Sequence, residues 1–466
     1  MRERSAHWSP PEHTSLLTTL LGAERAILLT IALSTMLAPL NSTMIAVALP
    51  DIMRAFRADL HAAGWLVTSY LVTMAAVLPV AGKLGDRFGR RPLVLGGLIY
   101  FGFASVGAAL APNLPVLLLF RFQQAVAGAI ALPNGSALVR EVIPEHRRAS
   151  SYGMIGAMVS VAAAAGPPLG GLLSGTAGWQ AIFWVNIPMV VAALIIGWYA
   201  LPSAPPRAAG RPFDVLGSVL LLASLAGFSL LLRQIGTALA PLILGGAALL
   251  LVAGLLARLE LRVPDPILHP EFFRSLPFAA ASGAVALSNL AMYSTLLALP
   301  VILAARQGWT SVRVGLALTA LSGTTVIFGP IGGRLADRYG RRAPVIAGLA
   351  TLSVGLLPLA VTGGNAAVPL LLVALAVAGV GLGISSAGMQ AAAVESVEAR
   401  HAGAASGIFS TSRYIGSIAG TSVLPVLLGD GTSGSGGVFI MTMIAALLSI
   451  VAALGLPPQA KPAPTP

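Results

Sequence analysis

Residues 82–98 read Gly-Lys-Leu-Gly-Asp-Arg-Phe-Gly-Arg-Arg-Pro-Leu-Val-Leu-Gly-Gly-Leu, and residues 333–349 read Gly-Arg-Leu-Ala-Asp-Arg-Tyr-Gly-Arg-Arg-Ala-Pro-Val-Ile-Ala-Gly-Leu. Ten of the 17 positions are identical at an offset of 251 residues, so the chain contains an internal repeat. Each copy connects two long apolar runs. Two copies in the same direction predict two similar halves of the chain with the same orientation.

The composition around the repeat identifies a membrane protein. Of the 466 residues, 56% are hydrophobic and 9% are charged, and the mean hydropathy is +0.87. A soluble domain carries about 25% charged residues, so a soluble enzyme and a disordered chain are both excluded. The chain contains no cysteine, which rules out disulfides, thiolate metal sites and a cysteine nucleophile.

Fourteen apolar runs are long enough to cross a membrane, because a helical span needs about 20 apolar residues. The sequence therefore predicts an all-α integral membrane protein with fourteen transmembrane helices. The runs are 26–49, 63–82, 92–111, 115–139, 152–174, 179–201, 214–233, 239–257, 276–304, 311–333, 343–362, 367–393, 403–427 and 437–456.

The repeat also predicts a domain organisation. If runs 1–6 match runs 9–14, runs 7 and 8 are a pair inserted between two bundles. We expect, in order, a cytoplasmic N-terminal segment, an N-terminal six-helix bundle, an inserted helix pair with a cytoplasmic linker, a C-terminal six-helix bundle and a disordered tail. Their ranges are 1–25, 26–201, 202–275, 276–456 and 457–466.

The basic residues predict the orientation of the chain. Of the 28 Lys and Arg residues, 21 lie on the side of the repeated loops, five lie on the other side, and Arg121 and Arg413 lie inside apolar runs. Cytoplasmic loops carry the excess of positive charge, so both termini are expected in the cytoplasm of a multi-pass inner-membrane protein. The net charge of +12 is thus a signal of topology, and no nucleic-acid partner is expected.

The repeated loops are candidate gates. Glycine allows a tight turn, and a cluster of Asp and Arg can form ion pairs in one conformation and lose them in another. The alternative is that the loops only fix topology. The candidate gating residues are Gly82, Asp86, Arg87, Gly89, Arg90 and Arg91 in the first copy, and Gly333, Asp337, Arg338, Gly340, Arg341 and Arg342 in the second.

Four further motifs carry a family resemblance. They are Leu40-Asn-Ser-Thr-Met-Ile-Ala-Val-Ala-Leu-Pro50, Arg121-Phe-Gln-Gln-Ala-Val-Ala-Gly128, Gly166-Pro-Pro-Leu-Gly-Gly171 and Gly178-Trp-Gln-Ala-Ile-Phe-Trp-Val-Asn-Ile-Pro188. With the repeated loops, they resemble the major facilitator superfamily, specifically its fourteen-helix drug:proton antiporter branch of the multidrug efflux type. The resemblance implies the major facilitator fold and alternating access. It also implies a sealing role for the fifth helix, through Gly166, Pro167, Gly170 and Gly171.

The chain departs from this family at Asn41, where the helix 1 motif normally has the Asp associated with proton coupling. No acid lies more than about a turn inside a predicted span, and all six histidines lie in tails or loops. Asn does not titrate, and Arg stays charged. If protons are coupled at all, the candidates are the acids at the rim of the spans, Asp51, Asp59 and Glu141.

Two arginines inside the spans are candidates for function, because an Arg at the membrane centre costs roughly 2.5–3.5 kcal/mol on insertion scales. Asn41 and Arg121 are expected to meet, about 12 Å and 9 Å below the outer ends of their helices at 1.5 Å per residue. Three interpretations stay open. Arg121 bonds Asn41, Gln124 and backbone carbonyls; an anionic or zwitterionic substrate supplies the missing negative charge; or coupling takes place at the rim.

The expected substrate-binding residues are polar or aromatic side chains within apolar helices, because an amide that faces lipid is costly. They are Asn41, Arg121, Gln124, Asn289, Tyr293 and Arg413. The chain has no nucleotide-binding Gly-x-x-x-x-Gly-Lys-Ser/Thr loop and no paired histidines, so no catalytic residue, metal or cofactor is expected.

The sequence thus favours a secondary active exporter of small amphipathic compounds that works by alternating access. The alternatives are an uncoupled facilitator or organic-anion carrier, which Asn41 favours, and a receptor or scaffold that no longer transports. The expected partners are a small-molecule substrate, membrane lipids and, if a rim acid couples transport, protons.

Overall fold

The computed structural model describes residues 22–202, 215–235, 239–262, 269–398, 401–429 and 434–458, and within these ranges the chain forms fourteen long helices. One of the fourteen consists of two consecutive segments, α8 and α9. In chain order they are α2 (Ala23–Phe56), α4 (Trp65–Phe88), α5 (Arg90–Ala109), α6 (Leu114–Val142), α7 (Glu145–Ala177), α8 (Ala181–Trp184) with α9 (Asn186–Ala200), α10 (Val215–Arg233), α11 (Leu239–Glu260), α12 (Leu276–Gln307), α13 (Ser311–Tyr339), α14 (Arg342–Thr362), α15 (Val368–Glu395), α16 (Ala402–Leu428) and α17 (Ser435–Ala453). Two short elements, α3 (Leu60–Ala63) and η1 (Pro270–Arg274), precede α4 and α12.

The predicted all-α membrane fold is confirmed. Thirteen of the helices in the described residues are long and apolar enough to cross a membrane. The remaining long helix is α16, which is rich in Gly and Ser and contains Arg413. It packs against α12, α4 and α10, so its polar side chains can meet protein rather than lipid.

Several helices extend beyond the apolar runs that predict them. Two of them end at glycines of the repeat, which shows why glycine stands at that position. The helix α2 extends to Phe56, where Arg57 turns into the left-handed conformation with φ 50°. At the repeated loops, α4 ends at Gly89 with φ 89°, and α13 ends at Gly340 with φ 83°. Both glycines occupy the same position of the repeat, and a residue with a Cβ would be strained there.

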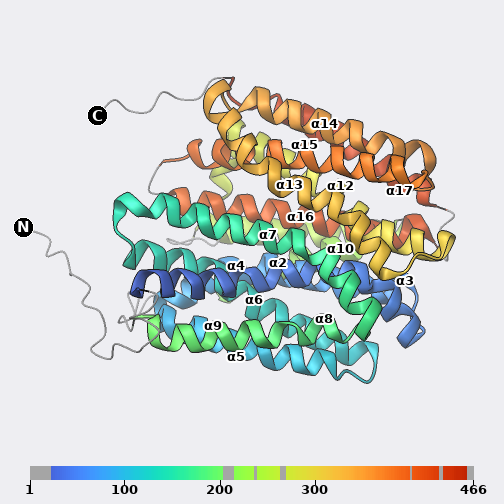
Figure 1. The fold of residues 1–466 in the computed structure, drawn as a ribbon. Coiled ribbons are helices and arrows are strands. Elements are labelled where there is room, and N and C mark those ends of the chain that lie inside the picture. Colours follow the sequence, from blue (N-terminus) through green and yellow to red (C-terminus); the bar gives the residue numbers. More distant parts are fainter. Residues whose placement is uncertain are drawn as a thin grey trace, which may run out of the picture.

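The helices form two groups that lie side by side. Figure 1 shows α2 to α9, coloured blue to green, in the lower half of the molecule and α12 to α17, coloured yellow to red, in the upper half. We call them the N-terminal helices and the C-terminal helices. The helix α10 packs against α4 and α16, and therefore contacts both groups.

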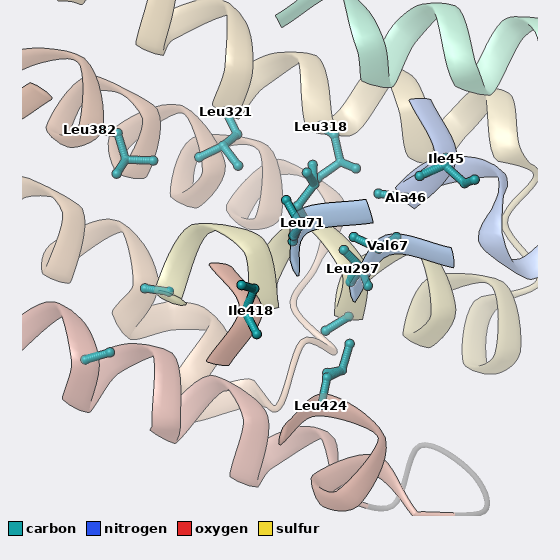
Figure 2. Packing of buried hydrophobic residues seen from close by; sticks show 14 of the residues in the cluster. Ile45, Ala46, Val67, Leu71, Leu297, Leu318, Leu321, Leu382, Ile418 and Leu424 are labelled. Atoms are coloured by element: carbon teal, nitrogen blue, oxygen red, sulfur yellow. The ribbon is translucent and has the colours of Figure 1, made fainter. Parts of the chain in front are cut away.

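The two ends of the bundle differ in how the groups share their cores. We call the end with residues 82–98 and 333–349 the motif end, and the end with Asp51 and Asp59 the far end. One hydrophobic cluster runs through both groups and includes Ile45, Val67, Leu297 and Leu318 from α2, α4, α12 and α13 (Figure 2). A second cluster, near the motif end, contains only N-terminal helices, with Ile27, Leu98 and Leu138 among its members.

Several of the predicted domain boundaries lie at or beside residues outside the described ranges. Most of the segments 1–25 and 457–466 is not described, and neither are residues 203–214, 236–238 and 263–268 of the inserted region. The division of the chain at these boundaries stays a prediction.

Candidate functional site

A buried polar cluster forms where α2, α4, α5, α6 and α9 meet. Arg121 is fully buried on α6, and its Nη1 donates hydrogen bonds to Gln124 Oε1 at 3.0 Å and to Asn41 Oδ1 at 3.4 Å. Its Nε donates to the carbonyl of Leu66 at 3.3 Å, and its guanidinium lies 4.2 Å from the centre of the Tyr70 ring. The structure thus brings together Asn41, Arg121 and Gln124, as their depths in the sequence predict.

Two residues of other helices complete this cluster. Asn41 Nδ2 donates to Asn186 Oδ1 at 2.6 Å, and Gln124 Nε2 donates to Ser105 Oγ at 2.8 Å. Asn186 Nδ2 in turn donates to Ser105 Oγ at 3.4 Å. Asn186, Ser105 and Tyr70 are absent from the substrate-binding residues expected from the sequence. Their only signal there is that they are polar side chains within apolar runs.

The remaining predicted substrate-binding residues lie on the C-terminal helices, and no described hydrogen bond joins them to this cluster. Asn289 donates to the carbonyl of Val285 in its own helix at 2.9 Å. Tyr293 lies on α12, and its hydroxyl is 3.3 Å from the Ser42 hydroxyl of α2, so the pair joins the two groups. Arg413 lies on α16 with its guanidinium 5.7 Å from the centre of the Phe409 ring.

The rim acids have three different surroundings. Asp51 Oδ2 accepts hydrogen bonds from Ser174 of α7 and, at 2.5 Å, from Ser311 of α13, and its other oxygen pairs with Arg54. Asp51 therefore has partners in both groups of helices. Asp59 caps α3 by accepting from the amide of Ala62 at 2.7 Å.

The third rim acid, Glu141, belongs to an ion-pair cluster at the motif end. Arg90 contacts Asp86 at 2.6 Å and Glu141 at 2.8 Å, and both Arg90 and Glu141 are largely buried. Glu141 therefore lies with the candidate gate rather than at the far end.

The second repeated loop forms the corresponding cluster. Arg341, the counterpart of Arg90, contacts Asp337 at 2.7 Å and holds Glu395 with two hydrogen bonds, of 2.6 Å and 3.1 Å. The hydrogen bonds to Glu395, more than those to Asp337, raise the pKa of Arg341 above its ordinary value despite partial burial. Arg341 therefore stays protonated throughout the physiological pH range.

The glycines of α7 allow this helix to approach closely both α13 of the other group and α2 of its own group. A Cβ at Gly171 would lie 2.4 Å from the Ser311 carbonyl oxygen and 3.0 Å from the Gly315 Cα of α13. A Cβ at Gly166 or Gly170 would collide with Thr43 or Met44 of α2. Only glycine permits such contact between backbones.

The described hydrogen bonds between the two groups lie toward the far end. They join Asp51 to Ser311, Thr68 to Thr421, Ser42 to Tyr293 and Ser322 to the carbonyl of Ala164. Each of these residues is closer in its helix to the far end than to the motif end. Together with the shared hydrophobic cluster, these contacts close the far end.

The comparisons with known proteins agree with the fold. The family described as Major Facilitator Superfamily matches residues 31–263 and 281–466. An uncharacterised transporter of this type from Bacillus subtilis, YvkA, is 33% identical over 93% of this chain and 96% of its own. The tetracenomycin C resistance and export protein of Streptomyces glaucescens is 30% identical, over 86% of this chain and 75% of its own. The multidrug resistance protein Stp of Mycobacterium tuberculosis is 33% identical, over 84% of this chain and 73% of its own.

A solved structure shares the fold. It is that of a bacterial homologue of the human lysosomal transporter Spinster, in an inward-facing and unoccupied conformation. It covers 95% of this chain and 99% of its own, with a TM-score of 0.69 and 16% identity. The chain therefore belongs to the major facilitator superfamily, which makes it a multi-pass membrane transporter and not an enzyme.

Proposed function

We propose that the chain exports small amphipathic compounds by alternating access between the N-terminal and C-terminal helices, as a member of the drug efflux branch of the superfamily. The closure of the far end by contacts that all cross between the two groups carries this proposal. Such contacts must break if the two groups are to open on that side. The names of the tetracenomycin C exporter and of Stp support export of drug-like compounds.

The excess of basic residues at the motif end supports placing that end in the cytoplasm. In that orientation both termini are cytoplasmic, the far end faces outward, and this conformation is inward-facing. The inserted helix α10 strengthens the closed side, because Arg233 donates to the His61 carbonyl at 2.9 Å and Ser229 contacts Ser422 at 2.8 Å.

A second candidate, an uncoupled facilitator, is favoured by the amide at position 41. Asn41 donates a hydrogen bond to Asn186 and accepts one from Arg121, but its amide does not titrate and cannot carry a proton across the membrane. Asp51 is the rim acid with partners in both groups, which favours it over Asp59 as the candidate for proton coupling at the far end.

The proposal is tested by locking the far end. Ser174 and Ser311 both donate to the same oxygen of Asp51, so their hydroxyls are close together. The natural chain has no cysteine, so Ser174→Cys with Ser311→Cys creates the only thiol pair. In liposomes loaded with unlabelled ethidium or fluorescein, the reduced double variant should take up the radiolabelled compound by exchange. Oxidation, or a short bifunctional thiol reagent, should stop this exchange.

Each single cysteine variant is the control, and its exchange should not respond to the oxidant. Reduction of the cross-linked protein should restore exchange. If the cross-linked protein exchanges as fast as the reduced protein, alternating access through the far end is wrong. Binding without exchange in every state would indicate a receptor.

A further inference from the structure

Arg413 carries a positive charge near the middle of α16 for which the described residues provide no acceptor. Its Nε is buried and has no hydrogen-bond partner, and its guanidinium contacts the face of the Phe409 ring at 5.7 Å. In the parts of the chain that the structure describes, no carboxylate pairs with it. Arg413 is partly buried within a membrane span, and a cation there without a counter-charge is costly, so the site is suited to receive negative charge from elsewhere.

Arg121, the other arginine inside a span, differs from Arg413 in the number of acceptors around it. Arg121 donates to Gln124, Asn41 and the Leu66 carbonyl, and stacks on Tyr70. Its Nη2 is also buried without a hydrogen-bond partner, but its Nε and Nη1 find three acceptors within the N-terminal helices. Arg413 has no comparable set of acceptors among the described residues.

The acidic residues lie too far along their helices to supply the missing charge. Asp51 is the acid that lies deepest within a described helix, and it lies five residues from the end of α2. It is already engaged with Ser174, Ser311 and Arg54. Asp86, Glu141, Asp337 and Glu395 are paired with arginines at the motif end.

Three aromatic side chains lie near Arg413, and two of them contact the N-terminal helices. Tyr293 of α12 and Tyr414 of α16 lie near Arg413. Tyr293 meets Ser42 of α2, and Tyr414 packs on the cluster of α4 and α6 side chains that contains Tyr70 and Met74. The site therefore combines one cation with apolar and phenolic walls, and it lies at the level where the closed far end begins.

We propose that Arg413 binds the anionic group of the cargo, and that the cargo is an organic anion with an apolar, aromatic body. This inference rests on the proposed transport function and names its substrate class. The guanidinium pairs with a carboxylate, sulfonate or phenolate, and the tyrosines contact the ring system of the same molecule. A lipophilic cation is disfavoured, because it would face Arg413 without an acid to offset the repulsion.

Direct binding to the purified full-length protein in lipid nanodiscs tests the charge preference. Fluorescein is the anionic probe and ethidium the cationic one, and fluorescence anisotropy measures both. Wild type should bind fluorescein more tightly than ethidium. Arg413→Gln should raise the Kd for fluorescein about tenfold or more, because removing one partner of a buried charge pair is strongly unfavourable. Arg413→Lys should retain most of the affinity, since it keeps the charge.

The matched control is Arg313→Gln, which removes an exposed arginine of α13 and should leave both Kd values unchanged. Arg413→Met is a second neutral variant that keeps an unbranched side chain, and thermal melting verifies folding of each. Wild type that fails to bind fluorescein, unchanged fluorescein binding in both neutral variants, or equal loss of fluorescein and ethidium binding would each overturn the proposal.

The failure of this inference differs from the failure of the transport function. If ethidium exchanges across liposomes and fluorescein does not bind, the protein transports but its cargo is not anionic. If fluorescein binds through Arg413 and nothing exchanges, the anion site stands and the transport proposal fails.

Discussion

Asn41 keeps the geometry of the carboxylate that its family motif normally has, without the charge. Its Oδ1 accepts from Arg121 and its Nδ2 donates to Asn186, so the amide uses both of its ends. A carboxylate at position 41 would neutralise Arg121 but could not donate to Asn186 unless protonated. Asn41, Asn186 and Ser105 therefore form a network of hydrogen bonds that contains no carboxylate.

Gly171 determines how closely α7 and α13 approach at the far end. We expect Gly171→Val to cost about 1–3 kcal/mol in the closed state, because its side chain would collide with backbone atoms of Ser311 and Gly315. That free energy shifts the equilibrium between closed and open far ends about five- to 150-fold. Spin labels on cysteines at Thr176 and Arg313 should report longer distances in this variant.

The matched control for this substitution is on the same helix. A Cβ at Gly156 would have no neighbouring atom within 4 Å, so Gly156→Val should leave the distance distribution unchanged. Equal effects of the two substitutions would show that helix propensity, and not the contact with α13, is responsible.

The two repeated loops place equivalent ion pairs in unequal surroundings. Arg90 and Glu141 are only 8% and 11% exposed, whereas Glu395, the partner of Arg341, is 44% exposed. We expect Glu141→Gln to lower the free energy of unfolding by about 2 kcal/mol, because it removes one partner of a buried hydrogen bond between charged groups. Glu395→Gln should cost less than about 1 kcal/mol, as for an ion pair open to solvent.

Thermal unfolding of the two variants in the same detergent compares these costs. A double-mutant cycle with Arg90→Gln should give a coupling of about 0.5–3 kcal/mol between positions 90 and 141. A larger loss for Glu395→Gln than for Glu141→Gln would contradict the assignment of the stronger pair to the N-terminal helices.

The sequence predicts the helices and one part of the site well, for different physical reasons. Apolar length determines where a chain can cross a membrane, and the depth of Asn41 and Arg121 follows from their positions along two helices. The lateral neighbours of a helix depend on packing, so the sequence does not predict the places of Asn186 and Ser105 in the cluster. The contact of Asp51 with Ser311 joins residues 260 positions apart, and no local pattern indicates it.

One core of the molecule joins both groups toward the far end and continues along the C-terminal helices to the motif end, where the N-terminal helices have a separate core. Ile45 and Val67 share a cluster with Leu297 and Leu318 of the other group (Figure 2). Ile27 and Leu98 pack only within their own group. The far end is thus closed by apolar contact as well as by the hydrogen bonds of Asp51, and opening it requires both to be broken.

The unpaired charge of Arg413 has an electrical consequence for the entire cycle. A cell interior is negative, and each elementary charge that crosses gains or loses about 2.3 kcal/mol per 100 mV. A monovalent anion that leaves the cell therefore moves toward the positive side of the membrane, which is favourable. At 100 mV the potential alone can sustain a concentration ratio of about 50-fold, outside over inside, so export of the anion needs no proton.

In liposomes with a potassium diffusion potential and no pH gradient, fluorescein should move toward the positive side. The sign of its accumulation should reverse when the potential is reversed, and Arg413→Gln should abolish it. Movement that follows an imposed pH gradient and ignores the potential would show that protons drive the cycle. If accumulation follows the potential, the protein needs no acid inside the membrane, because the membrane potential rather than a proton drives export.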